Sequence, residues 1–263
     1  MRRSRVTLVV LISAVLSMAG VLGVASASRS RSADVAAAPA PSPVPSGSAT
    51  TDVTVGRPVV VVLGASIAAG YRTGTAAPWP RQVDDLLLGQ AGAPRVVDAS
   101  ISATRMLIDT PAGPSFRSRL PAALAVPGVR AILVTDLIND IQAAPHIDDP
   151  AVIEAGLRGL VDQAHQRGIA VIATTMTPYG GYHYTDDYAF SPDGEACRQA
   201  VNAALRGGGL VDQVVDFDLA LADPTDPQRL DPLVDSGDHL HPNDAGHLAM
   251  SRAVARALTR PGG

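Results

Sequence analysis

The feature that most constrains the fold is an alternation of short apolar runs with longer amphipathic segments. The run 59–63 is continuously apolar and rich in β-branched residues, which is typical of a strand buried on both faces of a parallel sheet. Residues 150–167 place their apolar side chains on one face of a helix. This alternation predicts a three-layer α/β/α sandwich with a flavodoxin-like parallel sheet.

The expected elements place several polar residues at one edge of that sheet. We expect strands at residues 57–63, 95–98, 129–135, 169–174 and 214–217, and helices at residues 79–89, 150–167, 192–206 and 242–258. Ligands of such sheets bind beyond the carboxyl ends of the strands. Ser66 follows the first strand, residues 98–102 follow the second, and Asn139 follows the third, so these segments are expected to meet.

The first 55 residues differ in composition from the rest of the chain. Residues 1–5 hold three arginines, residues 6–24 are almost wholly apolar, and an Ala-Ser-Ala cleavage signal follows. This pattern predicts a signal peptide at residues 1–27 and an extracellular protein. An uncleaved membrane anchor is the alternative, because the apolar stretch is about long enough to span a bilayer. An Ala/Pro/Ser-rich, disordered linker is expected at residues 28–55, followed by one domain at residues 56–260.

Composition excludes several classes of function. The net charge is −4, the chain has no lysine and its arginines are scattered, so no nucleic-acid partner is expected. Cys197 is the only cysteine, which excludes an internal disulfide and a cysteine-based zinc site, and we expect its side chain to be buried. We expect residues His183, Asp186 and Asp187 to lie in a loop beside the ligand pocket. A metal site formed by these three residues is the less favoured alternative.

Two short motifs supply the parts for nucleophilic hydrolysis. Ser66 stands just past the first strand, and Asp238 and His241 lie three residues apart near the C-terminus. Serine needs a neighbouring base to remove its proton, and the base needs a third group that fixes its tautomer. The default explanation of the second motif alone is a turn that caps the last helix. Their order along one α/β pattern favours a single hydrolytic site.

The chain resembles the SGNH, or GDSL, esterase family, and within it a secreted bacterial subgroup similar to carbohydrate esterases. The resemblance covers nearly the whole folded part. The segments that carry it are Leu63-Gly64-Ala65-Ser66-Ile67, Val97-Asp98-Ala99-Ser100-Ile101-Ser102, Leu137-Ile138-Asn139-Asp140-Ile141 and Asp238-His239-Leu240-His241-Pro242-Asn243. Further matches to the subgroup are residues 177–181, 194–202 and 235–238.

The resemblance implies a serine esterase that acts on carboxylic esters without cofactor or metal. It implies Ser66 as nucleophile, His241 as general base and acid, and Asp238 as the group that orients the histidine. The implied oxyanion hole consists of the Ser66 backbone N–H, the backbone N–H at Ser100 and the Asn139 side-chain amide. The expected substrate is a short acyl ester, such as an acetyl group, on a polysaccharide or small molecule. A lipase- or phospholipase-like lipid esterase and a catalytically impaired carbohydrate-binding protein are the alternatives.

Three residues depart from the family pattern. The family usually has Asp where this chain has Ala65, and glycine where it has Ser100 and Leu137. We expect a less rigid turn at Ala65 and a side chain at Ser100 that crowds the oxyanion, because glycine permits close approach. The absence of the two glycines predicts reduced activity or a shifted substrate range.

Four further residues have open interpretations. His239 is the alternative base to His241, which we prefer because its spacing from Asp238 and the following proline match the family. Trp79 is expected either to line the cleft or to pack in the core. Glu195 and Arg198 lie one helical turn apart, so we expect an ion pair between them, with a role at the edge of the site as the alternative.

Overall fold

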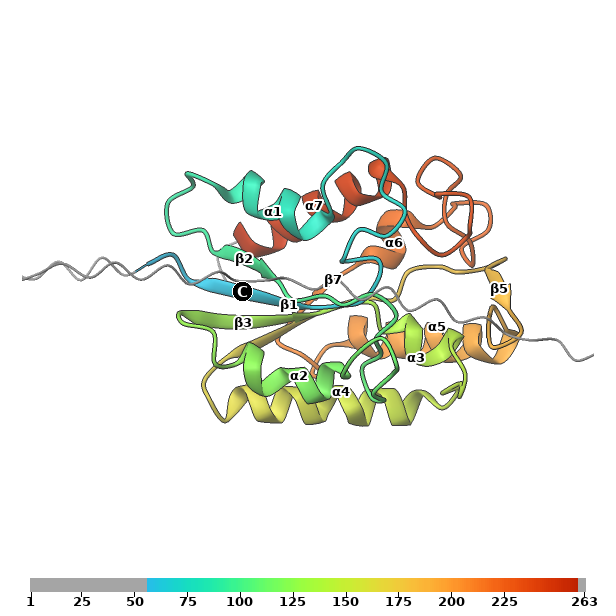
Figure 1. Cartoon of the computed structure of the whole chain (residues 1–263), viewed down its shortest axis with the longest axis horizontal. Helices are drawn as coiled ribbons and strands as arrows, with labels where there is room; N and C mark the ends of the chain where they lie inside the picture. The colour runs from blue at the N-terminus through green and yellow to red at the C-terminus, as the bar shows by residue number, and fades with distance from the viewer. Residues whose placement is uncertain (1–55, 260–263) are drawn as a thin grey trace, which may run out of the picture. The chain divides into compact units, whose positions relative to one another are not determined.

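The computed structural model describes residues 56–259 and shows three layers (Figure 1). A parallel five-stranded sheet with the order β2-β1-β3-β4-β7 lies between two layers of helices. Its strands are β1 (Val59–Leu63), β2 (Arg95–Asp98), β3 (Val129–Val134), β4 (Ala170–Thr174) and β7 (Gln213–Val215). The predicted α/β/α fold is therefore confirmed. The predicted signal peptide (1–27) and linker (28–55) lie outside the described residues.

The two helical layers differ in their members. The helices α1 (Trp79–Leu87), α6 (Phe217–Leu221) and α7 (Asp244–Thr259) cover one face. The other face carries α2 (Phe116–Ala123), α3 (Ile138–Gln142), α4 (Pro150–His165) and α5 (Pro192–Gly207). Between β4 and α5 in the sequence, β5 (His183–Thr185) and β6 (Tyr188–Ala189) form a separate small antiparallel hairpin. No helix within residues 56–259 is both long and apolar enough to cross a membrane.

The apolar run that predicts the fold forms the centre of the sheet. Along β1, Val59, Val61 and Leu63 pack in the core beneath α2 and α4, while Val60 and Val62 pack in the core beneath α1 and α7. Every residue of β1 is buried. Because both faces of the strand are covered, its sequence is continuously apolar rather than alternating.

Strand order determines where a site can form. β1 lies between β2 and β3, and Leu63 at its carboxyl end pairs with Val134 at the carboxyl end of β3. The chain leaves β1 toward β2 on one side and returns to β3 on the other, which creates the switch point where ligands bind in open α/β sheets. The segments after β1 and β3 therefore lie side by side.

The structure tests the expectations for Trp79, for the pair of Glu195 and Arg198, and for Cys197. Trp79 is fully buried and makes an edge contact with Phe217 at 5.5 Å between ring centroids, so it belongs to the core and not to a cleft. The expected ion pair of Glu195 and Arg198 is confirmed, with Nε and Oε2 2.8 Å apart. Cys197 is buried, as expected.

Three helices, α2, α3 and α6, and the hairpin escape prediction. α2 has Pro121 in its interior and weak apolar periodicity, both of which argue against a helix in sequence. It is nevertheless capped by Ser115, whose hydroxyl accepts from the Ser118 N–H, and it buries Phe116 and Leu120 against the sheet. Tertiary packing thus outweighs the local signal. α6 is only five residues long, which is too short to show a period.

Candidate active site

The turn after β1 carries Ser66 at the switch point. Ser66 is half-buried, and Gly64 immediately before the turn allows the loops after β2 and β3 to close on it. A Cβ on Gly64 would lie 2.7 Å from the Ser100 hydroxyl and 2.8 Å from Cγ2 of Thr135. Since real side chains do not approach so closely, glycine is required at this position.

Two hydrogen bonds join Ser66 to residues near the C-terminus. The Ser66 Oγ lies 2.9 Å from His241 Nε2, across 175 residues of sequence. The His241 Nδ1 lies 2.8 Å from an oxygen of Asp238. With Nδ1 donating to this carboxylate, Nε2 is the nitrogen that accepts from the serine hydroxyl. The structure therefore brings together the three side chains that the sequence predicts.

The Asp238 carboxylate is held as an anion. Its Oδ1 accepts from the backbone N–H groups of Leu240 and His241, at 3.1 and 2.9 Å. Burial opposes its charge, but the hydrogen bonds from the His241 ring and backbone outweigh burial and keep the pKa of Asp238 well below its usual value. The Arg72 guanidinium, 3.2 Å away, adds a partly exposed ion pair. Asp238 thus stays ionised at any pH at which a histidine loses its proton.

The loop that carries His241 is fixed at its base by Asn243. The Asn243 side-chain oxygen accepts from the N–H groups of Ala245 and Gly246 and so caps α7. Its amide group donates to the carbonyls of Leu233 and Asp235, at 3.0 Å each. One side chain therefore begins the helix and closes the loop in front of it, which sets the position of the imidazole.

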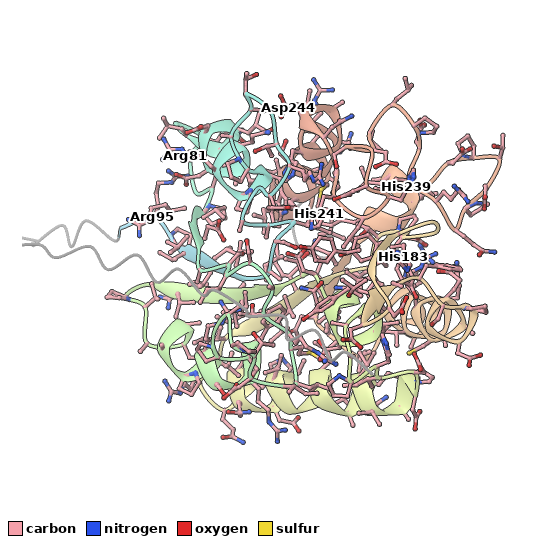
Figure 2. All side chains as sticks on the ribbon, turned by 45° about the vertical axis from the view of Figure 1, so that its right-hand side comes forward. Arg81, Arg95, His183, His239, His241 and Asp244 are labelled. Atoms are coloured by element: carbon pink, nitrogen blue, oxygen red, sulfur yellow. The ribbon has the colours of Figure 1, made fainter. Side chains whose placement is uncertain are left out.

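His239 is not joined to Ser66 in this structure. Its Nδ1 lies 2.6 Å from Asp235, and its ring lines the same cleft as His241. Figure 2 shows His241 near the centre of the molecule, with His239 and His183 on the side of the β5–β6 hairpin. The hydrogen bond to Ser66 comes from His241 alone, so the geometry favours His241 over His239 as the base.

Ser100 does not occupy the place expected of an oxyanion donor. Its backbone N–H donates to the Asp98 carboxylate at 2.9 Å, and Ser100 is not among the cleft residues. Its hydroxyl packs behind the nucleophile turn, against Gly64. The expectations of an oxyanion donor at Ser100 and of crowding by its side chain are therefore wrong, because this N–H is already used and points elsewhere.

Ala103 stands in the cleft where Ser100 was expected. It is exposed, it lines the cleft together with Ser66 and Asn139, and its backbone has φ 61°. This left-handed conformation favours glycine, so Ala103 is the residue at which a glycine would be natural. No described residue accepts a hydrogen bond from its N–H. The sequence carried no signal for it beyond small side chains at residues 102–103.

Asn139 lies in the first turn of α3, as its place after β3 predicts. Its side-chain nitrogen donates to the Thr104 carbonyl at 2.9 Å, and its oxygen accepts from the Gln142 amide at 3.1 Å. An amide nitrogen has two hydrogens, so one remains beyond the bond to Thr104, and Asn139 lines the same cleft as Ser66. The contact with Thr104 also ties this amide to the loop that carries Ala103.

The turn at Ala65 is braced by a more distant acid, contrary to the expectation of lost rigidity. The Asp136 carboxylate accepts from the N–H groups of Ala65 and Ala68, at 2.7 and 2.9 Å. Asp136 has φ 60°, whereas Leu137 has φ −62° and needs no glycine. Leu137 is fully buried in the core. Two of the three departures from the family pattern are thus accommodated by the fold.

Arg119 of α2 joins the loops that follow β1 and β2. Its guanidinium donates to the carbonyls of Gly64 and Ala99 and to the Thr104 hydroxyl. These bonds hold the second loop against the nucleophile turn. α2, which the sequence did not predict, therefore positions part of the site.

A cleft of about 800 Å³ opens over Ser66. Four of the five tyrosines of the chain line it, and no Phe or Trp does: Tyr71, Tyr182, Tyr184 and Tyr188. The Tyr71 ring makes an edge contact with the His241 ring, 4.7 Å between centroids. Burial, aided by nearby Asp238, raises the pKa of Tyr182 to about 12, so this hydroxyl remains a hydrogen-bond donor.

The hairpin forms one edge of this cleft and shows no metal-binding arrangement. His183 and Asp186 lie 3.4 Å apart with both side chains well exposed. Within residues 56–259, no group of three or more His, Cys, Asp or Glu side chains could hold a metal ion. His183, Tyr184 and Tyr188 instead line the cleft, in agreement with a loop beside the pocket.

Comparisons with known proteins give both a family and a fold. The model of the GDSL-like lipase/acylhydrolase family matches residues 62–249. The aryl esterase of M. smegmatis has 20% sequence identity and a TM-score of 0.58, over 76% of this chain and 99% of that chain. A catalytic mutant of an acetylxylan esterase from Geobacillus stearothermophilus has 20% identity and a TM-score of 0.56, over 78% and 95%. A search of curated proteins found no match.

A third solved structure has the same fold at lower identity. It is a carbohydrate acetylesterase from Sinorhizobium meliloti, with 16% identity and a TM-score of 0.54 over 76% of this chain and 97% of that chain. At such identities the similarity shows a shared fold, and the family match carries the functional information.

Proposed function

Because this chain belongs to the GDSL-like lipase/acylhydrolase family and is thus an ester-bond hydrolase, we propose that Ser66, His241 and Asp238 form its catalytic triad. The observation that supports this most strongly is the pair of hydrogen bonds, 2.9 and 2.8 Å long, that links the three side chains in the order the chemistry needs. The cleft over Ser66 offers a place for the ester.

The proposed reaction proceeds through an acyl-enzyme. The Ser66 oxygen attacks the ester carbonyl carbon while His241 Nε2 takes the hydroxyl proton. The tetrahedral intermediate collapses, the bond to the alcohol oxygen breaks, and His241 returns the proton to the departing alcohol. A water molecule then attacks the acyl-enzyme with His241 again as base, which releases the acid and restores the serine. Asp238 remains ionised and stabilises the imidazolium.

We propose an oxyanion hole made of the Ser66 N–H, the Ala103 N–H and the Asn139 side-chain amide. The first two N–H groups donate to no other described residue, and all three residues line one cleft. Fixed donors of this kind stabilise the negative charge of the tetrahedral intermediate without reorganisation. Ala103 replaces Ser100 in this assignment.

Triad substitutions should separate the roles of the two histidines. We expect Ser66→Ala and His241→Ala to reduce p-nitrophenyl acetate hydrolysis by several orders of magnitude, because nucleophile and base act as a unit. His239→Gln, the matched control, should retain most of the wild-type kcat. Since Asp238 is already ionised, kcat/KM should rise with pH over the acid range with the slope expected for the loss of a single proton.

Two results would contradict this assignment. Equal rates of ester hydrolysis for Ser66→Ala and wild type would reject Ser66 as the nucleophile and favour a carbohydrate-binding protein without efficient turnover. Loss of activity in His239→Gln, with activity retained in His241→Ala, would make His239 the base.

Substitutions in the second loop test the oxyanion hole. We expect Asn139→Ala to lower kcat on the order of 100- to 1,000-fold through loss of one donor. Ser100→Gly should leave kcat unchanged, whereas Ala103→Gly should maintain or raise it, because the N–H is kept and the left-handed strain is relieved. A rise in kcat for Ser100→Gly together with a loss for Ala103→Gly would restore Ser100 as the donor.

We further propose that the substrate is a short acyl ester, such as an acetyl ester, of a carbohydrate. The tyrosines supply aromatic faces with polar edges, and Tyr184, Tyr71 and Tyr188 are 76%, 52% and 41% exposed. The apolar face of a sugar ring packs on such surfaces while its hydroxyls remain hydrated. The large aliphatic side chains of the cleft are only Ile108 and Leu240, which offers little to a long acyl chain.

A substrate series with Tyr184 variants tests this class. We expect acetylated xylo-oligosaccharides and short p-nitrophenyl esters to be cleaved faster than esters of eight or more carbons. Tyr184→Ala should raise KM for the acetylated sugar more than for p-nitrophenyl acetate, and Tyr184→Phe, which keeps the ring face, should not. Preference for long acyl chains, with no cleavage of acetylated sugars, would favour the lipid-esterase alternative.

A further inference from the structure

Asp136 lies directly behind the nucleophile turn and is 5% exposed. Its Oδ2 accepts from the N–H groups of Ala65 and Ala68, at 2.7 and 2.9 Å. Its Oδ1 accepts from the Thr135 hydroxyl at 3.2 Å. One carboxylate therefore binds the residue before Ser66 and the residue two positions after it.

These bonds determine which N–H groups remain available at the turn. The N–H groups of Ala65 and Ala68 are turned inward to Asp136, while the Ser66 N–H donates to no described residue. A negative group that collects successive backbone N–H groups favours a helix-like turn, as at a helix N-terminus. The turn so fixed places the Ser66 hydroxyl against His241 and leaves the Ser66 N–H without an acceptor among the described residues.

The position of this carboxylate is itself fixed from two directions. Thr135, which donates to it, also makes a 2.9 Å hydrogen bond with Thr174 at the end of β4. The backbone at Asp136 has φ 60°, a left-handed conformation that non-glycine residues adopt at a cost and that Asp tolerates better than most. This conformation lies at the end of β3, where the chain turns from the strand toward α3.

We propose that Asp136 is a positioning residue for the nucleophile, acting from the end of β3 in place of an acid beside the serine at residue 65. This role rests on the proposed function of Ser66 as nucleophile. Asp136 does not line the cleft, so it has no contact with substrate; it acts through the turn and, by its charge, on the nearby His241. Its removal is therefore expected to slow the reaction without weakening substrate binding.

Two variants keep the left-handed backbone while they change the acceptor. Asp136→Gly removes the carboxylate at a φ that glycine adopts freely, and Asp136→Asn keeps one acceptor oxygen without charge. Asp218→Asn is the stability control. Asp218 is 8% exposed, close to the 5% of Asp136, and its carboxylate pairs with Arg198 and Arg206. It does not line the cleft. All are compared with wild type on p-nitrophenyl acetate, below their unfolding midpoints.

We expect Asp136→Gly to lower kcat on the order of 100-fold with KM nearly unchanged, since displacement of a reacting group by about 1 Å has an effect of that size. Asp136→Asn should retain more activity than Asp136→Gly, because its amide oxygen still accepts. Asp218→Asn should lower the unfolding midpoint while its kcat stays near that of wild type. This split between kcat and KM distinguishes positioning of the nucleophile from general stability.

Several outcomes would overturn the role of Asp136. A folded Asp136→Gly protein with wild-type kcat would do so, and so would a loss confined to KM. If Asp136→Gly does not fold, Asp136→Asn decides: kcat equal to wild type would overturn the role, because a neutral acceptor binds two N–H groups more weakly than a carboxylate. Measuring Ser66→Ala in parallel distinguishes failure of the Asp136 role from failure of the proposed function. Full activity of Ser66→Ala would reject Ser66 as the nucleophile.

Discussion

The hydrogen bond between Ser66 and His241 is the interaction on which the arrangement of this site depends. It joins the turn after the first strand to the loop before the last helix, and it is 2.9 Å long. The parallel sheet supplies the first partner, because the carboxyl ends of β1 and β3 meet at the switch point. Asn243 and Asp238 supply the second by fixing the loop that carries the imidazole.

The hydrogen bonds around this contact come from the sheet and from the helical layer that contains α2 and α3. Arg119 of α2 holds the second loop, Asp136 at the end of β3 holds the nucleophile turn, and Asn139 of α3 ties itself to Thr104. None of these three lies in the segment that it positions. The proposed chemistry thus depends on the sheet topology more than on any one motif.

Much of this was predictable from sequence, for physical reasons. The central strand β1 is a continuous apolar run, and the long helices α4 and α5 show clear periodicity, so the α/β sandwich follows. Ser66, Asp238, His241 and Asn139 were predicted to share a site, and the structure brings them together. Their roles in catalysis remain our proposal.

What escaped prediction depends on backbone conformation and on long-range contacts. Ser100 and Ala103 are both small residues in one loop, and only the left-handed φ of Ala103 and the occupied N–H of Ser100 distinguish them. Asp136 reaches a turn 71 residues away, which no local pattern shows. The helix α2 also escaped prediction, because Pro121 interrupts its local signal. Its stability comes from long-range packing against the sheet.

The proposal that Ser66 is a nucleophile activated by His241 is tested most directly by covalent labelling. The intact protein is incubated with a fluorophosphonate, whose phosphorus is attacked by an activated serine oxygen with loss of fluoride to give a stable phosphonate ester. The modified peptide is identified by mass spectrometry. We predict one adduct, on Ser66, and a greatly slowed reaction in His241→Ala. An adduct on another residue, or equal labelling rates with and without the imidazole, would contradict the account.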